Sequence, residues 1–257
     1  LFAQLRSEIR VIARNAEQLL VIIGIPAALL VFFSQVDVLP TNGQAPVDFL
    51  LPGIFALAIM STAMVSLGIA TGFERSYSVL KRLGATPLGT GRLILAKSLA
   101  VVLIEILQLV VLYSIAVMLG KDADIANVAL LVAAIFAGTL AFAGIGLLMA
   151  GTLRAEINLA TQNGLYLLLL LLGGVIFPLD ELPEPLQNIG KLLPSGALAD
   201  VLRGAITDTA AYGQNSWIVL ACWALLAPLT ATKFFAGVNL RLTLILLSSS
   251  PQQRIAR

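Results

Sequence analysis

The sequence predicts an all-α integral membrane protein with six transmembrane helices and with both chain ends in the cytoplasm. Two observations lead to this prediction: the composition and the placement of the basic residues. Of the 257 residues, 59% are apolar and 12% are charged, whereas a soluble domain has about 45–50% apolar and about 25% charged residues. A soluble fold could not bury this apolar excess, so most of the chain is expected to lie in lipid.

A helix needs about 20 mostly apolar residues to cross a bilayer. Six stretches approach this requirement: Leu19–Leu39, Phe49–Gly72, Ser98–Leu119, Val128–Leu153, Gly164–Phe177 and Trp217–Phe235. The fifth stretch is short and can extend backward over residues 159–163. No block of the sequence repeats and no low-complexity linker divides it, so residues 1–257 are predicted to form a single transmembrane domain.

The orientation follows from the positions of lysine and arginine. Of these 16 residues, 13 lie before the first predicted span, between the second and third, between the fourth and fifth, or at the C-terminal end, from Lys233 near the end of the sixth span onward. The opposite loops contain Lys121, Lys191 and Arg203. Cytoplasmic loops of membrane proteins carry an excess of lysine and arginine, so the sequence predicts that both ends of the chain are cytoplasmic.

Residues 1–18 are predicted to form an amphipathic helix on the inner membrane surface. Arg6, Arg10 and Arg14 recur every four residues and would share one face of this helix, opposite a face of apolar side chains. Such a helix places its apolar face in lipid and its arginines among the headgroups, so membrane lipid is one expected partner. The alternative is that the segment only fixes the topology.

Residues 73–97 form a cytoplasmic connection that is longer and more charged than a helix hairpin requires. Its first half, Glu74 to Leu83, is compatible with a helix. Gly84, Thr86 and Pro87 then predict a turn, because proline disfavours helical geometry in the residue before it. We therefore expect this segment to dock against a cytoplasmic protein.

Residues 178–213 form an external segment between the last two predicted spans. Pro185 can begin one short helix, and Pro194 with Ser195 can begin another. In the second helix, apolar side chains from Leu198 to Ile206 fall on one face. The pattern predicts two short amphipathic helices that form a lid or a re-entrant pair in the outer leaflet. The C-terminal residues 236–257 are expected to form a tail.

Three segments, in order along the chain, resemble the permease subunit of an ABC-2 type transporter of the drug-resistance or polysaccharide-export type. The similar residues are Arg14-Asn15 and Pro26; Phe73-Glu74-Arg75, Leu80, Ala85-Thr86-Pro87 and Lys97; and Pro178, Pro183, Leu186-Gln187, Pro194-Ser195 and Leu202-Arg203. Many members carry a glycine where Ser78 precedes Val79. Serine is also small, so the docking surface is expected to be kept, although the departure weakens a subgroup assignment.

The resemblance implies a dimer with a second permease copy or a paralogue, each chain docked on a separate ABC ATPase subunit. That subunit would bind ATP and Mg²⁺, and this chain would bind no cofactor or metal and contact no nucleic acid. The residues implied in coupling to the ATPase are Glu74, Arg75, Leu80, Arg82, Thr86 and Pro87. The residues implied in an external gate are Pro178, Pro194 and Arg203.

Independently of the resemblance, the chain lacks the ATP-binding pattern G-x-x-x-x-G-K-[ST]. The energy for transport must therefore come from another polypeptide or from an ion gradient. The chain has no histidine, which removes the commonest general base and metal ligand. We expect no catalytic residue in it, and an intramembrane enzyme is a third and weaker alternative.

Glu105 is the one acidic residue well inside a predicted span, and Gln108 lies one turn further along the same helix face. A charged side chain at the bilayer centre costs about 2.5–3.5 kcal/mol on insertion scales, so Glu105 is expected to face the bundle interior. Two interpretations stay open. Glu105 and Gln108 contact the substrate on its path, or Glu105 is a structural carboxyl bonded to a neighbouring helix or a second copy.

These observations favour an ATP-driven exporter permease in the cell membrane. The spans are rich in leucine, valine and alanine, so the path is expected to be apolar and to suit a lipophilic drug, a lipid or a lipid-linked glycan. The alternative function is an ion-coupled secondary transporter, for which Glu105 would be the protonatable site. Against it, no inverted repeat with broken helices is visible.

Overall fold

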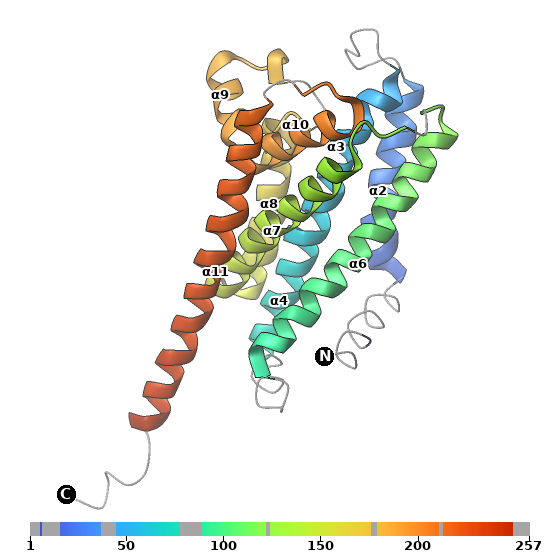
Figure 1. Ribbon diagram of the computed structural model, residues 1–257. Helices are drawn as coiled ribbons and strands as arrows, with labels where there is room; N and C mark the ends of the chain where they lie inside the picture. Colours follow the sequence, from blue (N-terminus) through green and yellow to red (C-terminus); the bar gives the residue numbers. More distant parts are fainter. Residues whose placement is uncertain are drawn as a thin grey trace, which may run out of the picture.

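The computed structural model describes residue 6 and residues 16–36, 45–77, 89–121, 124–175, 179–210 and 213–248. All elements in this part of the chain are helical (Figure 1). They are α2 (Ala16–Gln35), α3 (Pro46–Ile59), η1 (Met60–Ser66), α4 (Leu67–Ser76), α6 (Gly89–Met118), α7 (Val128–Thr152), α8 (Ala155–Leu172), η2 (Leu179–Glu181), α9 (Glu184–Leu192), α10 (Pro194–Thr207) and α11 (Gln214–Ser248).

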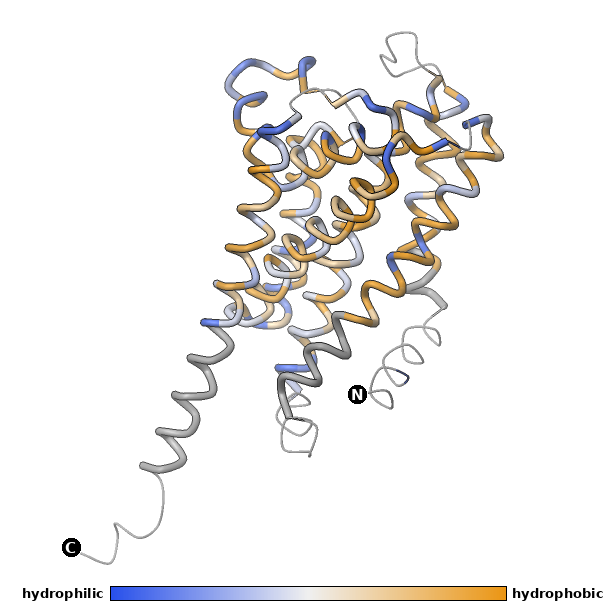
Figure 2. Tube along the Cα trace, viewed as in Figure 1, coloured by the Kyte–Doolittle hydropathy of each residue, from blue (hydrophilic) through white to orange (hydrophobic). Residues whose placement is uncertain are grey.

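Five helices of the described chain are long and apolar enough to cross a membrane. They are the continuous helix Pro46–Ser76, which comprises α3, η1 and α4, and helices α6, α7, α8 and α11. Helix α2 covers most of the first predicted span and contains a shorter apolar stretch, Ile22–Gln35. In Figure 2 the middle of the bundle is mostly hydrophobic and the polar residues gather toward its ends. The all-helical membrane fold is thus confirmed, while the sixth crossing and the topology stay predictions.

The helix Pro46–Ser76 forms the central rod of the bundle, and we use this name for it below. It begins with Pro46, which suits the first position of a helix because the N–H that proline lacks would have no helical partner there. Its middle, Met60–Ser66, is π-helical. In Figure 1 the central rod lies between α2 and α6 on one side and α7 and α8 on the other. Accordingly, 83% of its most apolar stretch is buried.

The small residues of α7 allow close helix packing. Gly138 faces the side chain of Leu198, and Gly144 faces the backbone at Pro228. A Cβ atom on Gly146 would lie 2.5 Å from the Met64 carbonyl oxygen of the central rod. Each glycine therefore marks a place where α7 approaches another helix more closely than a larger residue permits.

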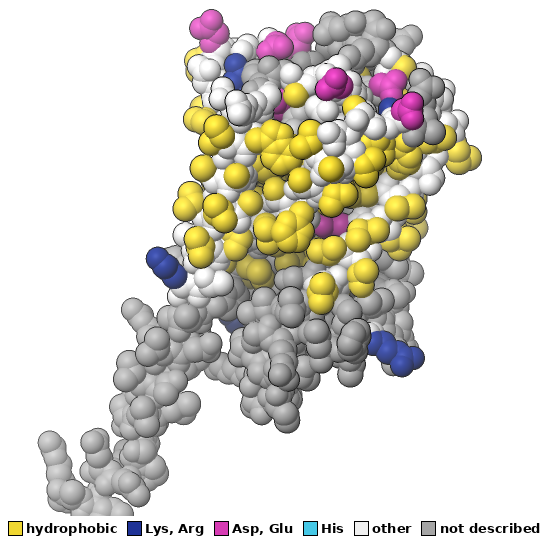
Figure 3. Space-filling view, viewed as in Figure 1, with side chains coloured by type: hydrophobic (Ala, Val, Ile, Leu, Met, Phe, Trp, Pro, Cys, Tyr) yellow, Lys and Arg dark blue, Asp and Glu magenta, His cyan; other side chains and the backbone are white. Residues whose placement is uncertain are grey.

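The described part of the segment predicted to be external contains the short turn η2 and two short helices, α9 and α10, which begin close to the predicted prolines. Helix α9 has Pro185 in its first turn, and α10 begins at Pro194. Helix α10 is buried from Pro194 through Leu202 and packs on α3, α7 and α11, while α9 is largely exposed. Figure 3 shows Asp and Glu side chains gathered at this end, above a wide hydrophobic belt.

Three helix boundaries differ from the prediction. Helix α8 covers Ala155–Leu172, so the fifth helix begins nine residues before Gly164 and ends before Phe177. Its end is set by the turn at Gly173 and Gly174, the second of which has a positive φ of 62°. Helix α11 continues to Ser248, so residues 236–248 of the predicted tail are helical. Helix α6 begins at Gly89, inside the predicted coupling segment.

Candidate functional site

Gln108 links three helices inside the bundle. Pro26 of α2 has no N–H, so the Ile22 carbonyl, four residues earlier, lacks its helical partner. The Gln108 side-chain nitrogen donates to this carbonyl at 2.7 Å. The Gln108 side-chain oxygen accepts a hydrogen bond of 2.8 Å from the Thr62 hydroxyl in the π-helical part of the central rod. Gln108 is fully buried, and its amide thus connects α2, α6 and the rod.

Glu105 faces the bundle interior, as the sequence predicts, and is only 1% exposed. Its Oε2 lies 2.6 Å from the hydroxyl of Thr139 on α7. The same hydroxyl is 2.8 Å from the Ile135 carbonyl of its own helix. Within the described part of the chain, Glu105 Oε1 has no hydrogen-bond partner. The carboxyl therefore joins α6 to α7 and keeps one oxygen able to accept a further hydrogen bond.

A second polar contact joins α4 to α8, and we call it the α4–α8 lock. Asn158 donates a hydrogen bond of 3.0 Å to the Gly68 carbonyl. Gln162 donates a hydrogen bond of 3.0 Å to the Asn158 side-chain oxygen. Gly68 faces the Gln162 side chain, and a Cβ atom on Gly72 would lie 2.5 Å from Asn158 Nδ2. Two glycines four residues apart on α4 thus receive two amides four residues apart on α8.

The α4–α8 lock was not predicted from the sequence. The sequence contains one indication of this contact. Gly68 and Gly72 are four residues apart, as are Asn158 and Gln162, and residues four apart share a helix face. The signal is weak, because nothing in the local sequence shows that these two helices are neighbours.

Arg75 ties the end of α4 to the connection between α7 and α8. The last carbonyl groups of a helix have no helical partner. Arg75 donates hydrogen bonds to the carbonyl oxygens of Gly151 and Leu153, the second at 2.6 Å. A cation is also favourable at this helix end. Arg75 is half-buried, as is the neighbouring Glu74.

Of the other residues predicted to act at the cytoplasmic side, only Arg6 is among the described residues. Arg6 is helical and exposed. The remaining ones lie outside the described residues: Arg10, Arg14, Leu80, Arg82, Thr86 and Pro87.

At the opposite end, Arg203 holds α10 against two neighbouring segments. Its guanidinium donates a hydrogen bond of 3.0 Å to the Gly174 carbonyl after α8. It also lies 5.7 Å from the ring centre of Phe49 on α3, which is a cation–π distance. Of the other predicted gate residues, Pro194 is buried at the start of α10 and Pro178 lies outside the described residues.

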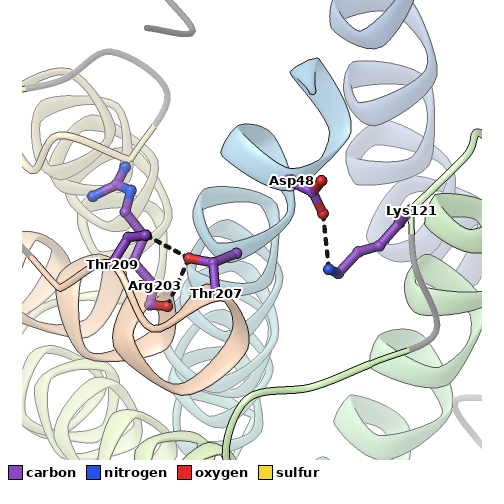
Figure 4. Close-up of polar contacts among 5 residues, drawn as sticks. All are labelled: Asp48, Lys121, Arg203, Thr207 and Thr209. Atoms are coloured by element: carbon purple, nitrogen blue, oxygen red, sulfur yellow. Dashed lines mark hydrogen bonds and ion pairs between the residues drawn. The ribbon is translucent and has the colours of Figure 1, made fainter. Parts of the chain in front are cut away.

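Two further polar contacts connect helices at this end. Figure 4 shows the Asp48 carboxylate of α3 and the Lys121 ammonium after α6 pointing toward each other, at 2.8 Å. Ser216 of α11 donates a buried hydrogen bond of 2.7 Å to Asp200 of α10. Helix α10 is thus held as a packed part of the bundle, in contrast to a loosely attached lid.

Sequence comparisons relate the chain to membrane transporters. The family model described as ABC-2 type transporter matches residues 1–207. The chain is 25% identical over 193 residues to a Bacillus subtilis (strain 168) protein named "Putative transport permease YvfS". The matched region covers 74% of this chain and 78% of that protein.

Proposed function

The chain belongs to the ABC-2 type transporter family, and from this premise we propose that it is the permease subunit of an ATP-driven exporter. As a member it is a multi-pass cell-membrane subunit of a transporter. In the proposal a separate ATPase subunit binds ATP and Mg²⁺. The permease moves a lipophilic drug, a lipid or a lipid-linked glycan out of the cytoplasm or the inner leaflet.

The contact of Arg75 with the α7–α8 connection is the observation that carries the proposal. The predicted coupling residues Glu74 and Arg75 lie at the end of α4, at the start of the predicted coupling segment 73–97, where the ATPase is expected to dock. A displacement of this end would also move α7 and α8, because Arg75 holds the Leu153 carbonyl. The α4–α8 lock would then carry the displacement along both helices.

The chemistry of the interior supports an apolar substrate. The described spans are lined mainly by aliphatic side chains, and Gln108 is engaged at both its oxygen and its nitrogen. We therefore propose that Gln108 supports the helices around the path. Glu105 is the better candidate for a direct contact with the substrate, because its Oε1 has no partner among the described residues.

The test is to purify the tagged chain in mild detergent with its ATPase and to measure vanadate-sensitive ATP hydrolysis. Glu74→Ala and Arg82→Ala are expected to release the ATPase or to lower substrate-stimulated hydrolysis. Glu184→Ala is the matched control, because it removes an exposed carboxylate from α9 at the opposite end. A chain that binds no ATPase, or coupling variants that behave like this control, would contradict the proposal.

One observation favours the alternative of an ion-coupled secondary transporter, namely the buried carboxyl of Glu105 with its open oxygen. The two functions separate in proteoliposomes. An exporter moves its substrate when ATP is supplied and no ion gradient is present. A secondary transporter moves it when an ion gradient is present and ATP is absent. If the protein is a secondary transporter, Glu105→Gln would be expected to abolish transport.

A further inference from the structure

The middle of the central rod is wound differently from its two ends. In η1 the backbone is π-helical, with hydrogen bonds between residues five apart, such as the bond from the Leu67 N–H to the Thr62 carbonyl. An α-helix bonds residues four apart, so a π-helical turn takes up one more residue. Such turns are rare, and they are frequent at functional sites and at bends of long helices.

The sequence of η1 does not by itself require π-helical winding. Residues 60–66 read MSTAMVS and contain neither proline nor glycine. Pro52 lies eight residues before η1, and the carbonyl that it leaves without a helical partner is that of Asp48. Methionine and alanine favour the α-helix. The neighbouring helices therefore set the winding of η1, and a change in their positions can change it.

The two halves of the rod are held by different helices. The half before η1, α3, packs mainly on α2, α6 and α10, whereas the half after η1, α4, packs on α7 and α8. Asn158 bonds α4 to α8, and Arg75 bonds it to the connection between α7 and α8. The π-helical segment thus lies at the boundary between two sets of partners.

The contacts of η1 itself allow movement. Gly146 of α7 lies against the Met64 carbonyl, so α7 presents no side chain that would interlock with the rod at this point. The Ser61 hydroxyl donates to the Ala58 carbonyl of its own helix at 2.9 Å. The Thr62 hydroxyl donates a single hydrogen bond to Gln108 of α6. One such bond is exchanged more readily than the several bonds that attach α4 to its partners.

We propose that η1 is a hinge of the transport cycle, about which α4 swings together with α8 relative to α3. The wider turns of η1 absorb the change in angle, and the Thr62–Gln108 bond breaks and re-forms as the rod bends. The proposal rests on the proposed function, because the ATPase supplies the force at the end of α4. It goes beyond that function by naming the segment where the rod bends and the helix that moves with α4.

Deletion of Val65 tests the surplus residue of η1. Without it, the segment can wind as an α-helix while α3 and α4 keep their faces, so the protein should fold and bind its ATPase. Deletion of Ile69 is the matched control, because Ile69 is half-buried like Val65 but lies in the regular helix α4. Its loss turns the residues after it by about 100° and moves Gly72 and Arg75 away from their partners. We expect a melting temperature in detergent near that of the parent for the first deletion and far below it for the second. An equal loss in both would overturn the proposal.

A distance between two spin labels measures the movement. The single native cysteine is removed by Cys222→Ser, and labels are attached at Leu99→Cys on α6 and Glu156→Cys on α8, which are both exposed. In nanodiscs with the ATPase bound, addition of ATP and vanadate is expected to shift this distance. The shift should be lost on deletion of Val65 and kept in Val65→Ala, which shortens the side chain but keeps the residue. A constant distance in the parent, or a shift that survives the deletion, would contradict the hinge.

A disulfide tests whether α4 and α8 move as one unit. A Cβ atom on Gly72 would lie 3.7 Å from the Cβ of Asn158, within the range of about 3.5–4.5 Å that a disulfide requires. Gly72→Cys with Asn158→Cys, in the background of Cys222→Ser, is therefore expected to form a bond on mild oxidation. ATP hydrolysis by the bound ATPase should be the same before and after oxidation. Hydrolysis that stops on oxidation and returns on reduction would show that α4 moves against α8, contrary to the proposal.

The same samples separate this proposal from the proposed function, because the ATPase that remains bound to the parent is measured alongside. A bound ATPase with an unchanged distance between the labels would contradict the hinge alone. A parent chain that binds no ATPase would contradict both the exporter and a hinge that an ATPase drives.

Discussion

The central rod and helix α8 lie in the same bundle but in different surroundings. The rod is covered by protein over 83% of its most apolar stretch, whereas the corresponding value for α8 is 22%. Mean hydropathy does not predict this difference, since α8, with a mean of 1.2, is less apolar than the rod, with a mean of 2.0, and yet is less covered by protein. Hydropathy thus identifies a span but does not show whether lipid or protein surrounds it.

The polar groups of the two helices show what each environment requires. In the rod, Thr62 is buried and bonded to Gln108. On α8, the inner amides Asn158 and Gln162 are bonded to α4 and α7, while Asn163 points outward. We therefore expect substitutions around the rod to affect stability most. Those on the outer side of α8 should affect stability least.

The largest effect is expected where α7 touches the backbone of the rod. Gly146→Ala would place a Cβ atom 2.5 Å from the Met64 carbonyl oxygen, and a helix backbone cannot move aside as a side chain can. Overpacking of this kind typically costs about 1–3 kcal/mol. We expect a clear loss of melting temperature in detergent. Gly24→Ala is the control, because its Cβ would meet only the Leu20 side chain at 3.8 Å. Equal stability of the two variants would contradict the close contact.

The next effect tests the bond between Gln108 and the carbonyl freed by proline. Gln108→Leu leaves the buried Ile22 carbonyl and the Thr62 hydroxyl without their partner, which costs about 1–3 kcal/mol for such groups. Pro26→Ala supplies the missing N–H to Ile22 within α2. The double variant should therefore recover part of the stability lost in Gln108→Leu. A double-mutant cycle with purely additive effects would show that the two residues are not coupled.

The sequence predicted the helices well because apolar length is a local property set by the thickness of the bilayer. It also placed the starts of α9 and α10 near Pro185 and Pro194, since proline favours the first turn of a helix. The start of α8 was missed. Asn158 and Gln162 make its first half read as polar, and only the neighbouring glycines of α4 make these amides acceptable in a membrane helix.

The candidate site was predictable only in part, for the same reason. Glu105 could be assigned an inward orientation, because an exposed carboxylate in lipid is costly. Its partner Thr139 could not be named, since the two residues meet only when α6 and α7 pack. Pro26 indicates a free carbonyl at Ile22, but the sequence does not show that Gln108 fills it. The contact of Arg75 with the end of α7 likewise could not be predicted from the sequence, because it forms only when α4 packs against α7.

A smaller effect is expected at the α4–α8 lock, where the two sides of α8 can be compared directly. Asn158→Ala removes the bond to Gly68 and the bond from Gln162, and we expect a loss of about 0.6–1.7 kcal/mol. Thr161→Ala removes an exposed hydroxyl that bonds only to its own helix, so its stability should hardly change. Thermal unfolding in detergent measures both. A larger loss of stability in Thr161→Ala than in Asn158→Ala would contradict the assignment of Asn158 to the inner side of α8 and Thr161 to the outer side.

The smallest effect on stability is expected for Glu105→Gln. This variant distinguishes a structural role of Glu105 from a role in transport. Glutamine has the same shape, and its amide can donate to or accept from the Thr139 hydroxyl, so Glu105→Gln should cost no more than about 0.6 kcal/mol. Glu105→Leu removes the contact and should cost more. If the open oxygen of Glu105 receives a cationic or hydrogen-bond-donating part of the substrate, Glu105→Gln should slow transport about tenfold, the effect of about 1.4 kcal/mol. If Glu105→Gln changes neither transport nor stability, the role of Glu105 is only structural, namely to join α6 to α7.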